Sequence, residues 1–260
     1  MTIVLWFSCS PVYRQHYNIE ATSDEQIDIN EKISIAGIWL SENYYNSLKE
    51  FKSPKKAQDN SLLLVIPESI SEKTTIMYDF HDDFENYAIV KNLSDYEIWE
   101  NFNNHNTKFE YNIKVISSTK IKIGETILIK IDPIKVKDFF HNGLKNELLV
   151  LEELLFKGIY ITLDGKKVEF KNNGQIEGLE GFFYYKPEID YYDQGMQVDQ
   201  LILVKSEKSI EWKDLEYYGF KFNMDTLELY KLNCIDFDST YQQCGIVENG
   251  ELLYKLWRIE

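Results

Sequence analysis

The sequence predicts a mainly β protein, at the margin of the α+β class, built from two antiparallel, barrel-like units with a few short helices. Three observations lead to this prediction. Short segments rich in β-branched and aromatic residues follow one another along the chain, Asn-Gly and Asp-Gly pairs separate several of them, and a glycine-led strand start occurs twice. With 44% apolar and 15% aromatic residues among 260, the chain can bury a substantial core.

Two runs of short segments are predicted as strands because β-branched and aromatic residues are enriched in them. The first run covers residues 35–40, 62–66, 74–80, 87–90, 109–116 and 126–131. The second covers residues 159–163, 168–170, 175–179, 182–185, 201–205, 219–222, 226–232 and 252–257. Asp164-Gly165, Asn173-Gly174 and Asn249-Gly250 are predicted as tight turns, because these residues tolerate positive φ angles.

Three segments are predicted to be helical. Residues 43–51 place Tyr44, Leu48 and Phe51 on one stripe, and residues 94–102 begin with a capping box that precedes aromatic residues at near-helical spacing. Residues 145–157 are rich in leucine and are followed by a glycine where a helix C-cap belongs. Glu152 and Glu153 are expected on the solvated side of this third helix.

The predicted organisation is an N-terminal segment over residues 1–30, a first β-rich domain over 31–140 and a second over 141–260. The alternative is one continuous assembly whose strands share a composition. The two-domain interpretation depends on a repeat, since Gly37-Ile38-Trp39 begins one strand block and Gly158-Ile159-Tyr160 begins another.

Gly37-Ile38-Trp39 resembles the signature of the lipocalin (calycin) family at the first strand of its barrel. In that family the tryptophan closes one end of the barrel, and an arginine near the C-terminus packs across it. The resemblance implies a structural role for Trp39 in the first unit. In the second unit it implies that Tyr160 replaces the tryptophan, with Arg258 as its partner. It further implies closed or nearly closed antiparallel barrels, but no particular ligand.

The charge balance narrows the classes of partner. The chain carries 43 acidic and 28 basic residues, for a net charge of −15. This balance argues against non-specific nucleic-acid binding and against docking on anionic lipid, which both need basic surface. A basic protein or a cationic ligand would instead be steered toward the molecule. The alternative is that the acidity serves only to maintain solubility.

The N-terminus and the three cysteines leave localisation open between the cell envelope and the cytoplasm. The apolar run at residues 2–8 ends at Cys9 and looks like the tail of a lipoprotein signal, so Cys9 is a candidate for lipidation; a buried first strand is the alternative. No apolar stretch is long enough for a membrane-spanning helix. Cys234 and Cys244 would form a disulfide in an exported protein and would be free thiols in the cytosol.

A weak candidate for metal binding lies between two predicted strands. Asp79, His81, Asp83 and Glu85 would share one face if the strand continued through them. The favoured interpretation is an acidic turn, and neither a metal nor a cofactor is predicted.

Two acidic segments with interleaved aromatic residues are the candidate partner-binding rim. Tyrosine and phenylalanine offer contact area, and aspartate offers charge for a basic partner; ordinary hairpin loops are the alternative. The residues of this rim are Asp190, Tyr191, Tyr192, Asp193, Asp236, Phe237 and Asp238.

No catalytic motif occurs in the sequence, so a non-enzymatic protein is predicted. The favoured hypothesis is an acidic immunity or inhibitor protein that neutralises a basic partner, such as an antibacterial toxin. The alternative is a lipocalin-like lipoprotein of the cell envelope that binds a small apolar ligand in a barrel.

Overall fold

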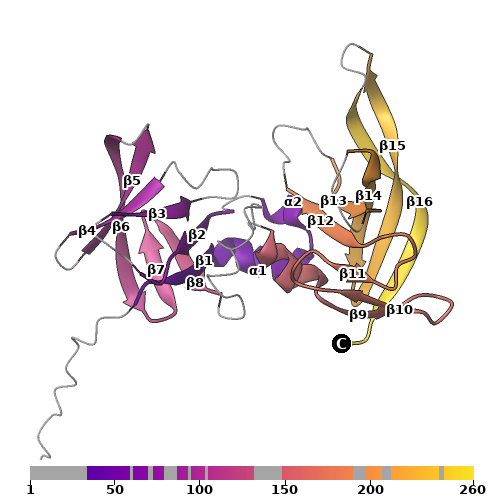
Figure 1. The fold of residues 1–260 in the computed structure, drawn as a ribbon, viewed down its shortest axis with the longest axis horizontal. Coiled ribbons are helices and arrows are strands. Elements are labelled where there is room, and N and C mark those ends of the chain that lie inside the picture. The colour runs from indigo at the N-terminus through magenta and orange to yellow at the C-terminus, as the bar shows by residue number, and fades with distance from the viewer. Residues whose placement is uncertain are drawn as a thin grey trace, which may run out of the picture. The chain divides into compact units, whose positions relative to one another are not determined.

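The computed structural model describes residues 34–58, 61–69, 73–78, 87–92, 95–102, 105–131, 148–189, 197–206, 212–239 and 243–260. These ranges belong to one compact unit that spans residues 33–260. Their strands form two antiparallel sheets with eight strands each, and the helices are short (Figure 1). The predicted fold class is confirmed.

The first sheet is a closed barrel in which each strand pairs with the next and the last pairs with the first. Closure removes the unpaired edges that an open sheet would expose. The strands are β1 (Gly37–Ser41), β2 (Leu63–Ile66), β3 (Lys73–Tyr78), β4 (Tyr87–Asn92), β5 (Asp95–Phe102), β6 (His105–Ser117), β7 (Lys120–Ile123) and β8 (Thr126–Lys130).

Side chains on alternate positions of these strands fill the barrel. Trp39 and Leu64 belong to this interior cluster, whereas their neighbours Ile38 and Val65 belong to a second cluster. The period of two follows from the pleat of a β-strand. The buried members of the interior cluster are Ile35, Trp39, Leu64, Ile66, Ile76, Ile89, Ile98, Ile113, Ile121, Ile123 and Leu128.

The second sheet has the same strand connectivity, but one pairing is reduced to a single bridge. Its first strand, β9, again pairs with its last strand, β16. Each later strand pairs with the next one along the chain. The exception is β11 and β12, which are joined by the isolated bridge Gln175↔Tyr184. The strands are β9 (Gly158–Ile161), β10 (Lys167–Phe170), β11 (Ile176–Glu177), β12 (Tyr184–Glu188), β13 (Gln200–Val204), β14 (Leu215–Asn223), β15 (Thr226–Asp238) and β16 (Gln243–Arg258).

The helices of the described chain are α1 (Glu42–Phe51), α2 (Pro54–Ala57), α4 (Leu149–Leu151), the π-helix η1 (Glu152–Phe156) and the 3₁₀-helix η2 (Trp212–Asp214). Apolar side chains of four helices, α1, α2, α4 and η1, belong to the second cluster. Helix α1 confirms the first predicted helix: Ser41 caps it, and Tyr44 and Leu48 are buried. Phe51 was predicted on the same stripe but is 44% exposed, because it ends the helix beyond the turn that packs.

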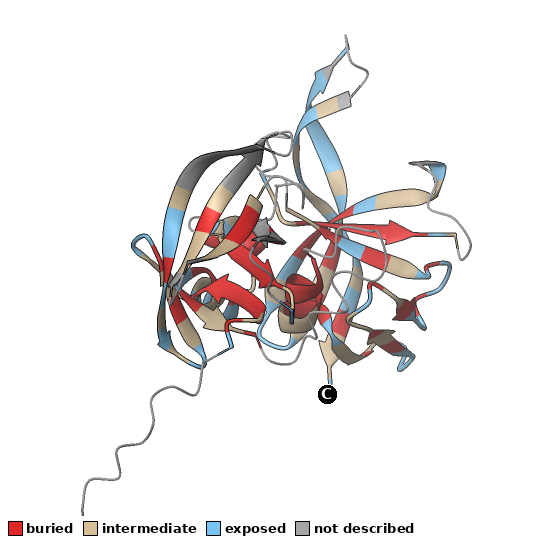
Figure 2. Cartoon of the chain, turned by 60° about the vertical axis from the view of Figure 1, so that its left-hand side comes forward, coloured by how far each residue is buried: buried red, intermediate tan, exposed pale blue. Residues whose placement is uncertain are grey.

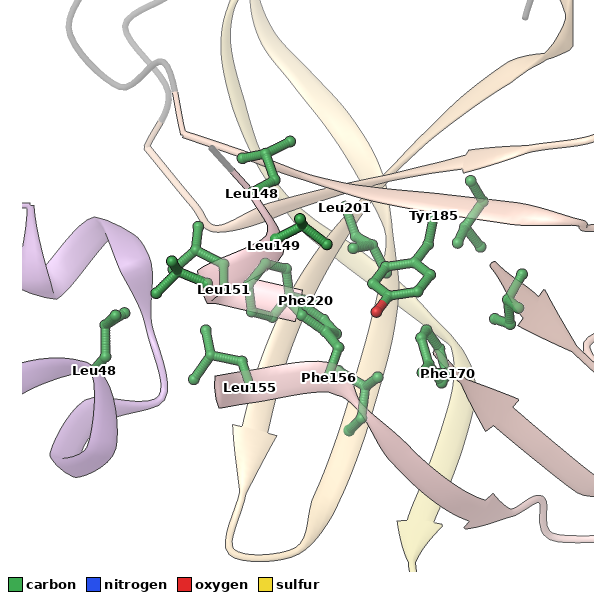
Figure 3. Packing of buried hydrophobic residues seen from close by; sticks show 14 of the residues in the cluster. Leu48, Leu148, Leu149, Leu151, Leu155, Phe156, Phe170, Tyr185, Leu201 and Phe220 are labelled. Carbon is green, nitrogen blue, oxygen red and sulfur yellow. The ribbon is translucent and has the colours of Figure 1, made fainter. Parts of the chain in front are cut away.

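Phe156 lies at the centre of the aromatic core of the second sheet. Its ring centroid is 5.1 Å from that of Phe220, 5.6 Å from Tyr185 and 6.2 Å from Phe170. Such spacings suit the edge-to-face and tilted contacts that aromatic pairs prefer. Figure 3 shows these rings together, with Leu48 of α1 on the side of Leu151 and Leu155.

The start of each sheet has the same construction. In the first, the Trp39 indole N–H donates to the Ile35 carbonyl oxygen at 2.8 Å, and the Lys130 ammonium of the last strand lies 5.5 Å from the indole centroid. In the second, the Tyr160 hydroxyl donates to the Phe156 carbonyl oxygen at 2.8 Å. The guanidinium of Arg258, again from the last strand, lies 5.7 Å from the Tyr160 ring centroid.

A glycine begins each of these strands at a position where the backbone has a positive φ angle. Gly37 and Gly158 have φ angles of +147° and +156°. A Cβ on Gly37 would lie 2.5 Å from Cε of Lys130, and one on Gly158 would lie 2.5 Å from the Glu260 carbonyl oxygen. The positive φ angle therefore favours glycine at both positions, and at Gly158 the backbone of the chain end also leaves no room for a side chain.

The second predicted helix is wrong, because residues 95–102 form strand β5. Ile98 is fully buried and pairs with Ile89 of β4 on one side and Tyr111 of β6 on the other. The capping-box pattern is a local signal, and pairing with two neighbouring strands outweighs it.

The third predicted helix is confirmed in part. Within the described part of residues 145–157, an α-turn gives way to a π-helix, with the Lys157 N–H donating to the Glu152 carbonyl oxygen at 2.7 Å. This i to i+5 bond changes the angular spacing of the side chains. Glu152, predicted on the solvated side, is consequently buried at 6% exposure.

Two of the three predicted turns are confirmed, and the third lies inside a strand. Asp164-Gly165 connects β9 to β10, and Asn173-Gly174 connects β10 to β11. Asn249-Gly250 belongs to β16 instead, where the pairing shifts register between Tyr230↔Leu252 and Leu232↔Asn249. A glycine beside such a shift is typical of a β-bulge.

We expect Asp199→Ala to lower the free energy of unfolding by about 1–2 kcal/mol, because Asp199 caps α2. Its carboxylate accepts from the Ser53 hydroxyl at 2.5 Å and from the Lys55 N–H at 2.8 Å. Urea denaturation measures the loss. Asp199→Asn is the matched control, because it keeps one acceptor oxygen and should lose less; equal losses for the two variants would contradict the capping role.

Candidate functional site

Strands β15 and β16 extend beyond the strands beside them (Figure 1). The pairing of β14 with β15 reaches no further along β15 than Lys231, and β9 pairs with β16 at Trp257 and Arg258. Within the described residues, 232–238 and 243–249 therefore pair with each other and with no third strand. We call these two segments the outer ribbon.

A disulfide closes the outer ribbon. Cys234 of β15 and Cys244 of β16 are bonded, and their Cα atoms are 5.7 Å apart. A two-stranded ribbon without a third strand is marginally stable in water. Closing so short a loop raises the free energy of the unfolded chain by about 3 kcal/mol, because fewer conformations remain open to that chain. The disulfide thus holds in one shape a segment that no hydrophobic core supports.

Large apolar side chains of the outer ribbon face solvent. Ile235 is 59% exposed and Phe237 is 57% exposed, with Ile246 at 36%. No ribbon residue that the structure describes is in the buried class, although the side-chain amide atoms of Asn249 at the base of the ribbon are buried, and Figure 2 shows both strands of this region as exposed or intermediate. A set of exposed apolar side chains on a rigid support is typical of a protein-binding surface.

All charged residues in the stretch of sequence that forms the ribbon are acidic. Residues 232–249 include Asp236, Asp238 and Glu248, and this stretch contains no lysine or arginine, although the chain has 28. Asp236 and Glu248 are exposed. With no cation in the same stretch of sequence, their charges give this surface a negative potential that attracts cationic groups.

The structure places part of the predicted binding rim on this ribbon. Asp236, Phe237 and Asp238 end strand β15 instead of lying in a loop. Residues 190–193, the other half of the predicted rim, lie outside the described residues, as do Cys9 and the metal candidates 79–85. Ile235 and Ile246 were not predicted as surface residues, because nothing in a strand-like sequence shows where the third strand of a sheet ends.

Glu152 is the described acid whose environment is most unusual. Burial raises its pKa from the usual 4.5 to about 7, and a backbone hydrogen bond with Gly174 opposes part of that rise. Burial of Tyr185, and to a smaller extent the nearby charge of Glu152, raise the pKa of the Tyr185 hydroxyl. That hydroxyl donates to the Lys171 carbonyl oxygen at 2.6 Å. The Glu152 carboxyl group is therefore buried beside groups whose hydrogen bonds are already made, and it does not line a cleft.

A surface groove of about 400 Å³ lies near the start of β9 and the end of β10. Its two lysines are engaged, because Lys157 pairs with Glu153 at 2.7 Å and Lys171 pairs with Glu177. In the described part of the chain, no group of three or more histidine, cysteine or acidic side chains is placed to hold a metal ion. The outer ribbon is therefore the stronger candidate site.

Comparison with known proteins finds no matching family model, no matching curated protein and no matching solved structure. Among the helices that the structure describes, none has the length and apolar character needed to cross a membrane.

We expect Glu152→Gln to flatten the dependence of stability on pH. Because the pKa of Glu152 is higher in the folded state, its protonated form favours folding, and that stabilisation is lost as the pH rises from about 4.5 to about 7. The loss amounts to about 3 kcal/mol. Urea unfolding at pH 5.5 and pH 8 should show a smaller difference for the variant than for the native chain.

The control for this experiment is Glu153→Gln. Glu153 is the neighbouring acid on the same helix, and its carboxylate accepts hydrogen bonds from Lys157 and from Asn172. This variant should keep the native difference between the two pH values. If Glu152→Gln and the native chain show the same difference in stability between pH 5.5 and pH 8, the Glu152 carboxyl group is ionised in the folded protein well below pH 7.

We expect the paired variant Cys234→Ser, Cys244→Ser to loosen the outer ribbon without unfolding the sheets. Apart from the pairing of its two strands with each other, no strand pairing holds the described ribbon, whereas the sheets have their own cores. Amide hydrogen exchange should accelerate in residues 232–249 and stay slow in β13 and β14. Unchanged exchange in the ribbon would show that strand pairing alone maintains it.

Proposed function

We propose that this protein is a non-enzymatic acidic binding protein that neutralises a basic protein partner, as an immunity or inhibitor protein does for an antibacterial toxin. The observation that carries the proposal is the outer ribbon. It is closed by a disulfide, exposes Ile235 and Phe237, and combines three acidic residues with no basic residue over 232–249. Together these features suit the recognition of a cationic protein surface.

Each feature has a separate role in binding. The net charge of −15 steers a basic partner to the molecule and raises the association rate, an effect that salt weakens. The exposed ring of Phe237 is suited to act as an anchor in an apolar pocket of the partner. Because the disulfide fixes the ribbon before the encounter, less conformational entropy is lost on binding.

The filling of the two sheets supports this proposal over the binding of a small apolar ligand. Isoleucine and leucine side chains with Trp39 occupy the described interior of the first barrel. The aromatic side chains of Phe156, Phe170 and Tyr185 occupy that of the second. An internal ligand would have to displace these side chains, so we do not propose one.

Kinship with the lipocalin family is a further part of the proposal. It is supported by the glycine and aromatic residue that begin each sheet and by the cation from the last strand that lies over the ring. The kinship concerns the barrel and not the ligand. We also propose a location in the cell envelope, because a disulfide persists in an oxidising compartment.

We expect the combined variant Asp236→Asn, Asp238→Asn, Glu248→Gln to bind the partner about tenfold more weakly than the native chain. The tagged full chain would be used to capture the partner from its native cells, and the complex would be weighed by native mass spectrometry in low and high salt. Titration with the purified partner then gives the affinity of each variant.

Glu180→Gln is the matched control, because Glu180 is an exposed acid outside the ribbon. It should bind the partner as the native chain does. A stoichiometric basic protein that dissociates in salt and binds the ribbon variant poorly would support the proposal. Capture of no basic protein, or equal binding by both variants, would contradict it.

A further inference from the structure

The outer edge of β16 is unpaired over most of its length. β16 pairs with β15 on its inner side, whereas on its other side β9 pairs at Trp257 and Arg258. In the described residues from 244 to 254, no strand lies against that outer edge. Backbone N–H and C=O groups along an edge strand are positioned to pair with a strand from another chain.

The composition of this edge opposes pairing with an identical edge. Proteins commonly protect an exposed edge with lysine, proline or β-bulges. Residues 244–254 contain neither lysine nor proline, although the pairing of this stretch with β15 shifts register. They contain Glu248 and Glu251, which are both exposed. A second copy would bring the same carboxylates alongside and would add a chain that itself carries a net charge of −15. A basic strand would bring charges of the opposite sign.

Apolar side chains flank this edge on both faces of β16. Leu252 and Leu253 are each 43% exposed, and consecutive side chains of a strand point to opposite faces. Ile246 adds a further exposed side chain nearer the disulfide. An added strand with alternating residues could therefore contact apolar groups on either face while its backbone pairs with β16.

We propose that an extended basic segment of the protein partner adds to the outer edge of β16, along residues 244–254, as a further antiparallel or parallel strand. This inference rests on the function proposed above. It describes how the partner would bind along β16, from the ribbon to residue 254. Main-chain hydrogen bonds set the register of the added strand. Glu248 and Glu251 select its basic side chains. Leu252, Leu253 and Ile246 contact its apolar side chains.

The test uses a capped nine-residue peptide of alternating lysine and valine as the probe. The same peptide methylated at every backbone nitrogen keeps its charge and side chains but cannot donate main-chain hydrogen bonds. The full chain, labelled with ¹⁵N, is titrated with each peptide. Amide hydrogen exchange is then measured along β16.

The unmethylated peptide should slow exchange about tenfold or more at alternate amides within each regular stretch of residues 244–254, because an added strand pairs with every second residue and the register shifts of β16 interrupt that alternation. The methylated peptide should bind at least about tenfold more weakly, since several hydrogen bonds are lost. Glu248→Gln with Glu251→Gln should weaken the unmethylated peptide about threefold to tenfold. Glu180→Gln should leave its affinity unchanged.

Several outcomes would overturn the strand-addition mode alone. One is equal binding of the methylated peptide. Another is failure of the unmethylated peptide to bind although the captured basic protein does bind the ribbon. A third is a dimer in sedimentation velocity with these amides already protected, which would assign the edge to a second copy. If neither the peptide nor any basic protein binds, the proposed function fails as well.

Discussion

The pairing of the first strand with the last is the constraint on which both sheets depend. In each sheet the first strand begins at a glycine with a positive φ angle, and at Gly158 the chain end also approaches too closely for a side chain. An aromatic ring two residues later is covered by a cation from the last strand, Lys130 in one sheet and Arg258 in the other. Strands distant in sequence are thereby brought together, and in the first sheet this pairing closes the barrel.

The same pairing explains why a ribbon extends from the second sheet. β9 is short and meets β16 near its C-terminal end, while β14 meets β15 near its N-terminal end. The remaining lengths of β15 and β16 have each other as partners. Without a third strand there is no inner face to bury, so apolar side chains such as Phe237 stay exposed and a disulfide replaces the core as the source of order.

Charge and packing are arranged differently in the core and on the ribbon. In the core, Glu152 is buried, so its ionised form is disfavoured and its pKa rises to about 7. On the ribbon, Asp236 and Glu248 are exposed, so their charges can act on a partner through solvent. The buried carboxyl group of Glu152 makes the stability of the fold depend on pH. The exposed carboxylates of the ribbon suit an association that depends on salt.

The sequence by itself determined the mainly β class, the turns at Asp164-Gly165 and Asn173-Gly174, and the acidity of the ribbon, because these depend on local propensity or simple composition. The tertiary structure decided that residues 95–102 form a strand, that Asn249-Gly250 lies in a bulge and that Glu152 is buried. Each of these depends on which distant strand or helix lies alongside, and local sequence patterns carry no information on that pairing. The exposure of the ribbon was hidden for the same reason, since it follows from where the neighbouring strands stop.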